Sequence, residues 1–293
     1  MHPIIKDSLQ ERYETFCAEL AKCRHHPSLE GVHDLRVSIR RLNAVLVKIE
    51  QFDPTIMVNE CARELKLLMK PLGKLRDVHV QVEWIEKIFS LIGPGLNEYL
   101  KRLWSREKRL QKKIIALTAR YSPVACAALH GRILALPATY DEARFTEISG
   151  TLLSGLYGEL TGMKEGASAA NNAAHLHCMR ISVKKYRYTV EILRPILGDG
   201  AARLLKRIHA MQTLLGDIHD FDVLIEILAR FSRRKKRTKY EVSNIRNSLR
   251  KLRKLRREMN ARFLSILDDE LAAIAPDKFI EGTANERDGQ AQG

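Results

Sequence analysis

The chain of 293 residues is poor in aromatic side chains and has no long apolar run. Phe, Trp and Tyr together make up 6% of it, and apolar and polar residues rarely alternate as they do along half-buried strands. No segment approaches the roughly 18 consecutive apolar residues of a membrane span, so we expect no membrane insertion. The opening segment MHPIIKDSLQERY turns polar too early for a signal peptide.

Cysteine is also scarce and unpatterned. The five cysteines are odd in number, lie far apart and form no CxxC motif: Cys17, Cys23, Cys61, Cys126 and Cys178. This pattern predicts neither a disulfide framework nor a thiolate zinc site, and it favours a reducing cytoplasm. The motifs GxxxxGK[ST], GxSxG and HExxH are missing as well, so the common phosphate-loop, serine-hydrolase and zinc-protease sites have no signal.

Positive charge is abundant. Lys and Arg number 50 against 35 Asp and Glu, which gives a formal net charge of +15. Such a surface attracts polyanions, whether nucleic acid, polyphosphate or an acidic membrane, and the charge alone does not choose among them.

Helical periodicity runs through almost the whole sequence and predicts an all-α fold. Proline and glycine residues, among them Gly73, mark the expected breaks. The expected helices lie near 4–24, 30–51, 55–71, 77–92, 95–120 and 123–135, and then near 143–163, 174–194, 199–214, 220–233 and 238–274.

A basic motif occurs twice. The segment VHDLRVSIRRLNAVL at 32–46 returns as LHCMRISVKKYRYTV at 176–190, a shift of 144 positions. On a helix His33, Arg36 and Arg40 share a stripe roughly 60° wide, opposite Leu35 and Ile39. The shift carries His33, Arg36, Arg40 and Arg41 onto His177, Arg180, Lys184 and Lys185.

Two further repeats accompany this motif. Leu72, Gly73 and Asp77 match Leu215, Gly216 and Asp220 at a shift of 143. A second basic stripe also returns after 144 positions, with Arg102, Arg106, Arg109 and Lys113 matching Arg246, Arg250, Arg253 and Arg257. Few acidic residues balance these stripes, so an anionic partner would relieve their self-repulsion.

The repeats predict an internally duplicated chain. We expect a first helical half at 1–140, a second at 141–275 and a disordered tail at 276–293. The segment GASAANNAA at 166–174 resembles a flexible loop, but its register places it inside the second half.

Each motif also has an ordinary structural interpretation. A single His33 is more often a surface histidine than a ligand-binding one, and its duplication is what favours function. Gly73 and Gly216 fit helix C-caps, and Asp77 and Asp220 fit the N-caps of the following helices. Alternatively, these carboxylates hold arginines in position within a basic site. The sequence leaves both interpretations open.

The run from Asp217 to Asp222 contains neighbouring His and Asp residues, which also serve as metal ligands. The pair His33-Asp34 becomes His177-Cys178 in the second copy, and no further ligands are spaced to complete an octahedral site. This disfavours a metal site.

Together these segments resemble the CHAD family, whose LGxxRDxDV pattern is similar to LGKLRDVHV and LGDIHDFDV here. The resemblance implies two four-helix bundles with pseudo-twofold symmetry around a basic cleft or pore that binds inorganic polyphosphate without catalysis, metal or cofactor. Two positions depart from the pattern: His79 replaces the second Asp, and His219 replaces the Arg. The ligands that the resemblance implies are the eight residues of the His33 motif and its copy. The repeated charge pattern adds the eight residues of the two basic stripes, and we expect Asp77, Asp220 and Asp222 to support them.

Two alternatives stay open at this point. One is a nucleic-acid-binding module, most plausibly for RNA, since RNA and DNA would also be attracted to such a surface. The other is a metal-dependent phosphohydrolase that uses the His-Asp neighbours. The sequence also leaves open whether the basic segment 233–239 belongs to the cleft, and whether the protein associates with polyphosphate granules.

Overall fold

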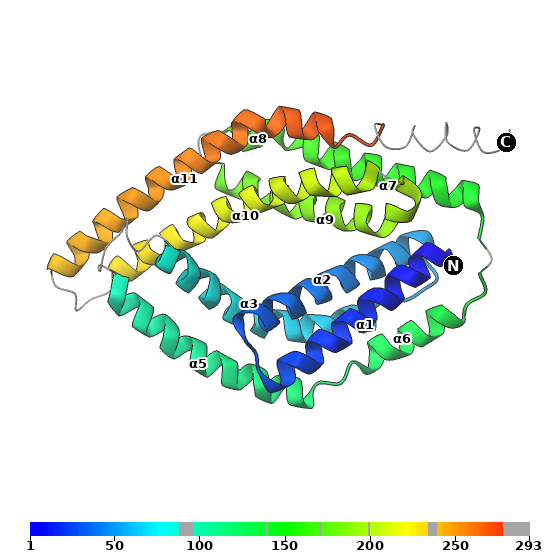
Figure 1. Ribbon diagram of the computed structural model, residues 1–293, viewed down its shortest axis with the longest axis horizontal. Helices are drawn as coiled ribbons and strands as arrows, with labels where there is room; N and C mark the ends of the chain where they lie inside the picture. The colour runs from blue at the N-terminus through cyan, green and yellow to red at the C-terminus, as the bar shows by residue number, and fades with distance from the viewer. Residues whose placement is uncertain (88–95, 139, 170–171, 199, 234–238, 278–293) are drawn as a thin grey trace. The chain divides into compact units, whose positions relative to one another are not determined.

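The computed structural model describes residues 1–87, 96–138, 140–169, 172–198, 200–233 and 239–277. The described residues form helices and contain no strand, as the sequence predicts (Figure 1). The chain divides into two compact units, Met1–Asp141 and Glu142–Gly293. No helix within the described ranges is both long and apolar enough to cross a membrane.

The first unit consists of α1 (Pro3–His25), α2 (Leu29–Phe52), α3 (Asn59–Lys87), α5 (Asn97–Arg120) and α6 (Val124–Ala135). Helix α2 packs against α1 and α3, and α3 also contacts α5 and α6 (Figure 1). Local sequence sets the first two helix starts. Pro3 occupies the first turn of α1, where no N–H is needed, and the Ser28 hydroxyl accepts a hydrogen bond of 3.0 Å from Gly31 N at the start of α2.

The second unit consists of α7 (Glu142–Gly162), α8 (Lys164–Ser168), α9 (Ala173–Leu197), α10 (Gly200–Ser232) and α11 (Lys239–Ala273). Helix α9 contacts α7, α8 and α10, and α10 also contacts α11. The Tyr186 hydroxyl at the centre of α9 donates a 2.7 Å hydrogen bond to the Ile274 carbonyl, which holds the end of α11 against the core.

Helices α2 and α9 bury the same positions when one is shifted by 144 residues. Each buries a stripe that lies opposite its basic residues, as the periodicity predicts. The buried residues of α2 are Val32, Leu35, Ser38, Ile39, Leu42, Val45, Leu46, Lys48 and Ile49, and the matching positions Leu176, Met179, Ser182, Val183, Tyr186, Thr189, Val190, Ile192 and Leu193 are all buried in α9.

The predicted breaks at Gly73 and Gly216 are wrong. Helix α3 runs through Gly73 and α10 runs through Gly216 without interruption. A glycine inside a helix costs only about 1 kcal/mol relative to alanine, and tertiary packing outweighs that cost. Leu72 and Leu75 are buried beside the first glycine, and Leu215 and Ile218 beside the second. The C-cap and N-cap interpretations of these motifs are therefore wrong too.

Two other expectations need correction. The segment 166–174 is not wholly a loop, because Gly166, Ala167 and Ser168 belong to α8 and Ala167 is buried. Pro276, which the prediction assigns to the disordered tail, is buried. The remainder of that prediction falls on residues 278–293, which lie outside the described residues, as do residues 234–238 of the basic segment at 233–239.

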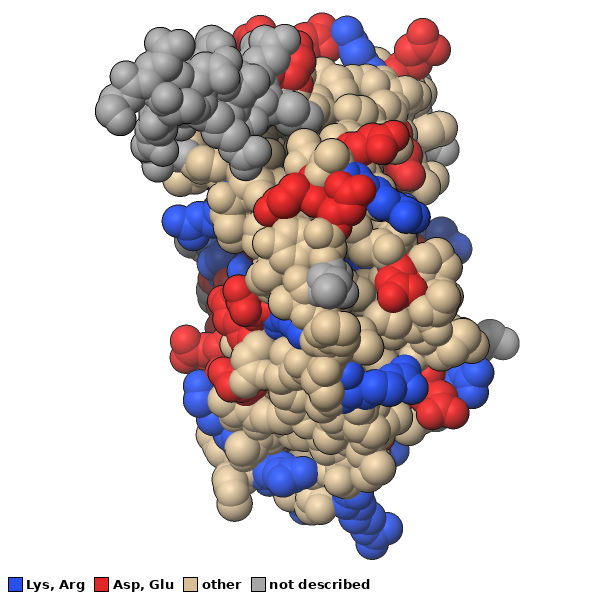
Figure 2. All heavy atoms as spheres, turned by 90° about the vertical axis from the view of Figure 1, so that its right-hand side faces the viewer, with Lys and Arg blue, Asp and Glu red and all other residues tan. Residues whose placement is uncertain are grey.

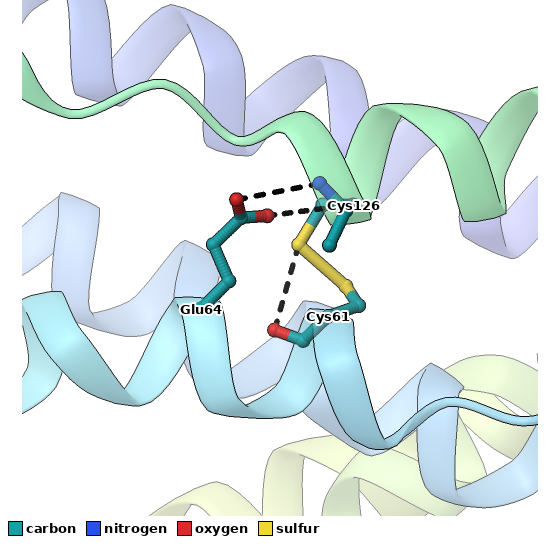
Figure 3. Close-up of a disulfide and its surroundings, with 4 residues drawn as sticks. Cys61, Glu64 and Cys126 are labelled. Carbon is teal, nitrogen blue, oxygen red and sulfur yellow. Dashed lines mark hydrogen bonds between the residues drawn. A yellow bond between two sulfur atoms is a disulfide. The ribbon is translucent and has the colours of Figure 1, made fainter.

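The prediction that no cysteines pair is also wrong. Cys61 of α3 forms a disulfide with Cys126, the third residue of α6. Glu64, one turn after Cys61, reaches the same turn of α6, where its carboxylate accepts hydrogen bonds from Ala125 N at 3.3 Å and Cys126 N at 2.9 Å (Figure 3). The two cysteines are 65 residues apart in the chain, so only the packing of α3 against α6 brings them together. Their pairing removes the cysteine argument for a reducing compartment.

Candidate functional site

The basic stripe of α2 lies opposite its buried face. His33 is exposed, Arg36 and Arg40 are partly exposed, and Leu35 and Ile39 are buried. The next helix in space, α3, adds Arg76 and Asp77 to the same region. Asp77 is among the predicted supporting acids, and Arg76 appears in the prediction only as a residue of the family pattern. The packing of α3 against α2 brings this part of α3 to the stripe.

Asp77 is the electrostatic centre of this region. The charges of Arg36 and Arg40 from α2, Arg76 from α3 and Arg106 from α5 all act on its carboxylate. Burial raises the pKa of Asp77, and the four guanidinium groups oppose that shift. Four permanent positive charges thus act on this carboxylate, and Glu83, whose Oε2 lies 3.9 Å from Nη2 of Arg76, partly offsets them. We call the residues His33, Arg36, Arg40, Arg76, Asp77 and Arg106 the Asp77 cluster.

His33 experiences three of the same charges. Burial lowers its pKa below the ordinary value of 6.5, and Arg76, Arg40 and Arg36 lower it further. The imidazole is therefore neutral at neutral pH in the unliganded protein. An anion bound at the cluster would reverse part of this shift, because it favours the protonated ring.

Arg36 rests on the backbone of α3. Its Nη1 donates a 3.2 Å hydrogen bond to the Met69 carbonyl, one turn before Gly73. A Cβ atom at Gly73 would lie only 3.0 Å from this Nη1. The repeated glycine therefore occupies the place where an arginine of the neighbouring helix approaches the helix backbone.

The second unit gathers a corresponding set of side chains. Nδ1 of His177 on α9 lies 3.3 Å from Nδ1 of His219 on α10, and the two ring centroids are 4.7 Å apart. Burial lowers the pKa of His219 to about 4, and the neighbouring charges of Arg180, His177 and Lys184 act in the same direction, whereas Asp222 opposes them. We call His177, Arg180, Lys184 and His219 the His219 cluster.

Lys185 does not join this cluster. Its Nζ lies 3.5 Å from Oε2 of Glu159 on α7, on a different side of α9 from Lys184. Arg41, the matching residue in α2, is partly exposed at the equivalent helix position. The prediction included both residues because they match between the two copies of the motif, but one step along a helix turns the side chain by about 100°, so they lie off the stripe of His33, Arg36 and Arg40.

Asp222 holds an arginine that the sequence analysis did not select. Arg256 of α11 donates from Nε to Oδ1 at 2.9 Å and from Nη2 to Oδ2 at 3.2 Å. The same Nη2 donates to Oδ1 of Asn172 at 3.0 Å. Spacing along one helix cannot reveal a pair between two helices, so the only available signal was that Arg256 lies within the basic run that supplied Arg253 and Arg257.

His79, which departs from the family pattern, has a different kind of partner from the acid at the matching position of the second unit. His79 is fully buried on α3, and its Nε2 lies 3.2 Å from Oε1 of Glu107 on α5. Burial lowers the pKa of His79 and the Glu107 carboxylate opposes that shift. In the second unit an acid on α10 pairs with a base on α11, whereas here a base on α3 pairs with an acid on α5.

The two basic stripes differ from each other in structure. All eight stripe residues are exposed: Arg102, Arg106, Arg109, Lys113, Arg246, Arg250, Arg253 and Arg257. At the shift of 144, however, buried Leu103 and Ile114 fall on exposed Asn247 and Glu258. Each stripe therefore has a different position relative to the buried face of its own helix. Arg106 is the stripe residue that the structure connects to Asp77.

The surface also carries acidic side chains. On the face drawn in Figure 2, Lys and Arg side chains are interspersed with Asp and Glu and with uncharged residues. A positive net charge therefore does not by itself mark a site on this protein. The two clusters are distinguished instead by cationic side chains of neighbouring helices whose charges act on one titratable group, Asp77 or His219.

In the ranges that the structure describes, no three or more His, Cys, Asp or Glu side chains are grouped so that they could hold a metal ion. This covers the run from Asp217 to Asp222, which lies entirely within α10.

These helices and arginine-rich clusters define an all-helical protein with a concentrated positive charge on particular helix faces. The chain belongs to the CHAD domain family, whose model matches residues 7–229. It is similar in fold to the crystal structure of the CHAD domain from the plant Ricinus communis, with a TM-score of 0.73, 20% identity, and coverage of 92% of this chain and 91% of that chain. It is also similar to PptA from Streptomyces chartreusis, with a TM-score of 0.56, 16% identity, and coverage of 92% and 96%. No curated protein matches the chain.

Proposed function

We propose that this protein binds inorganic polyphosphate through the Asp77 cluster and the His219 cluster and that it does not catalyse a reaction. The observation that carries the proposal is that the positive charges of Arg36, Arg40, Arg76 and Arg106 all act on the carboxylate of Asp77. Membership of the CHAD family, which is associated with polyphosphate binding, supports the same substrate class.

The chemistry of the clusters suits a phosphate chain. Guanidinium groups form paired, charge-assisted hydrogen bonds with phosphate oxygens and stay charged at all physiological pH values. A polyphosphate has no bases to read, so binding needs only an array of such donors. Sequence-tolerant binders of single-stranded nucleic acid also use large aromatic side chains for stacking, and the residues that define the two clusters include no Phe, Tyr or Trp.

We further propose that the two units are copies of one ancestral unit. The coincident buried positions of α2 and α9 support this origin. In that case each unit contributes one anion-binding cluster, and a single long polyanion engages both.

The decisive experiment is a competition titration at near-physiological salt. Labelled long-chain polyphosphate is displaced with unlabelled polyphosphate, RNA and duplex DNA at equal total charge. We expect polyphosphate to compete much better than either nucleic acid. Equal competition would identify a general polyanion binder and reject the polyphosphate assignment.

A second measurement tests the absence of catalysis. Polyphosphate is incubated with the protein and divalent metal, and released phosphate is followed over time. We expect no release above the rate without protein. Metal-dependent release that disappears in Asp220→Asn would identify a phosphohydrolase instead.

A further inference from the structure

Two glycines occupy matching places inside long helices. Gly73 of α3 faces Arg36 of α2, and Gly216 of α10 faces Arg180 of α9. Glycine destabilises a helix interior relative to alanine, and both glycines lie inside their helices, where no helix cap requires them. A reason for glycine therefore has to come from what lies next to it.

At Gly73 the neighbour is the end of a side chain. A Cβ atom there would meet Arg36 Nη1 at 3.0 Å and Cζ at 3.8 Å. The first distance is shorter than an ordinary contact between such atoms, so alanine would require the guanidinium to shift by a few tenths of an ångström. The same Nη1 donates to the Met69 carbonyl at 3.2 Å, and the displacement would strain or break this hydrogen bond.

We propose that Gly73 is a positioning residue: by lacking a side chain it lets Arg36 lie against α3, where the Met69 carbonyl holds the guanidinium beside Asp77. This inference rests on the proposed function, since it concerns the geometry of the same anion-binding cluster.

Holding Arg36 in place matters because its neighbours repel it. Arg40, Arg76 and Arg106 share the carboxylate of Asp77 with it. An arginine that is not anchored would move into solvent, and binding an anion would then have to order it again. A guanidinium fixed before the anion arrives avoids that entropy cost.

The second unit provides an internal comparison. A Cβ atom at Gly216 would lie 3.8 Å from Arg180 Nε, which is an ordinary van der Waals contact. Alanine therefore fits at Gly216 with little displacement of Arg180. The inference predicts unequal effects of the same substitution at two matching positions, with the larger effect at Gly73.

The test measures polyphosphate affinity and its salt dependence for Gly73→Ala, Gly216→Ala and Gly155→Ala. Gly155 is the matched control, because it lies inside α7 with nothing within 4 Å of an added Cβ atom. We expect Gly73→Ala to lose about tenfold in affinity, with a log–log salt slope shallower by about 0.7 because one phosphate contact is lost. Gly216→Ala should lose less, and Gly155→Ala should bind like the wild type.

A double-mutant cycle with Arg36→Ala separates positioning from a general structural effect. If Gly73 acts through Arg36, then Gly73→Ala should have no further effect on affinity in the Arg36→Ala background. Thermal melting of the same variants provides a second readout. A melting temperature lowered by Gly73→Ala and restored in the double variant would also show the close approach of the two residues.

The outcomes are distinguishable. Wild-type affinity in Gly73→Ala together with reduced affinity in Arg36→Ala would overturn this inference and leave the proposed function intact. An equal loss from Gly73→Ala with and without Arg36 would overturn it as well. Failure of the wild type to bind polyphosphate would instead reject the proposed function.

Discussion

The two clusters differ in the residue that occupies one matching position. Arg76 in the first unit corresponds to His219 in the second at a shift of 143. The arginine is always charged, whereas the pKa of His219 is lowered to about 4 by burial and by neighbouring cations, so its ring is neutral at neutral pH. The Arg76 position of the Asp77 cluster therefore carries a constant charge, whereas the charge at the matching position of the His219 cluster depends on pH.

This difference predicts how affinity changes with pH. A bound phosphate chain favours the protonated ring, so the pKa of His219 rises on binding and the complex takes up a proton. In an Arg36→Ala/Arg40→Ala variant, which depends on the second unit, polyphosphate affinity should increase as the pH falls from about 7 to about 5. Calorimetric titrations at several pH values and in buffers of different ionisation enthalpy measure both the affinity and the proton uptake.

The control for this prediction is His219→Arg in the same background. The new arginine should raise affinity at neutral pH and weaken the pH dependence, because it is charged throughout. An affinity that is independent of pH in the Arg36→Ala/Arg40→Ala protein would contradict the proposed role of His219.

Ion pairs also connect neighbouring helices. Asp222 and Arg256 join α10 to α11, and both side chains are largely shielded from water, with exposed fractions of 25% and 15%. One turn further along α10, Glu226 pairs with Arg230 at 3.2 Å, but these side chains are 68% and 66% exposed. The two pairs have similar chemistry in very different surroundings.

Asp222→Asn should therefore destabilise the protein by about 2 kcal/mol, since it leaves a half-buried guanidinium with a weaker partner. Glu226→Gln is the matched control, and it should change stability by less than about 0.5 kcal/mol because solvent screens the exposed pair. Urea denaturation of both variants checks the difference. Equal effects would show that the contact between Asp222 and Arg256 is not a stabilising interaction.

The disulfide between Cys61 and Cys126 predicts a redox-dependent stability of the first unit. It closes a loop of 65 residues, so reduction should lower the free energy of unfolding by about 4 kcal/mol on the loop-entropy model. Denaturation with and without reductant measures this, and Cys61→Ser/Cys126→Ser should not respond to reductant. Alkylation of both thiols in the folded, unreduced protein would show that they are not paired.

Helix periodicity was sufficient to predict most helices and their buried faces, because one buried stripe per helix leaves a clear signal in the sequence. It failed at Gly73 and Gly216, where a local helix-breaking preference was weaker than the packing of leucines on either side. It also could not identify Arg256, Glu107 or the cysteine pair as partners. Each of these contacts joins two helices, and the distance between helices is not encoded in the spacing along either one.

For the whole molecule, the proposed function predicts a dependence on polyphosphate length. If one chain engages both clusters, the second contact becomes intramolecular and affinity rises steeply once the chain is long enough to reach both. Removing one cluster with Arg36→Ala/Arg40→Ala, or the other with Arg180→Ala/Lys184→Ala, should abolish this rise while short chains still bind the remaining cluster. A length series measured by fluorescence anisotropy tests the prediction, and a smooth increase that survives in both variants would contradict it.

Because α2 and α9 bury matching positions, the two helices can be aligned with each other residue by residue. Ile39 and Val183, or Leu46 and Val190, fill the same position with different volumes. Leu42 and Tyr186 differ more, and the tyrosine has a carbonyl partner at Ile274 that its hydroxyl requires. For protein engineering, each matched pair suggests a core exchange to try first, and the tyrosine marks the position where an exchange has to include its hydrogen-bond acceptor.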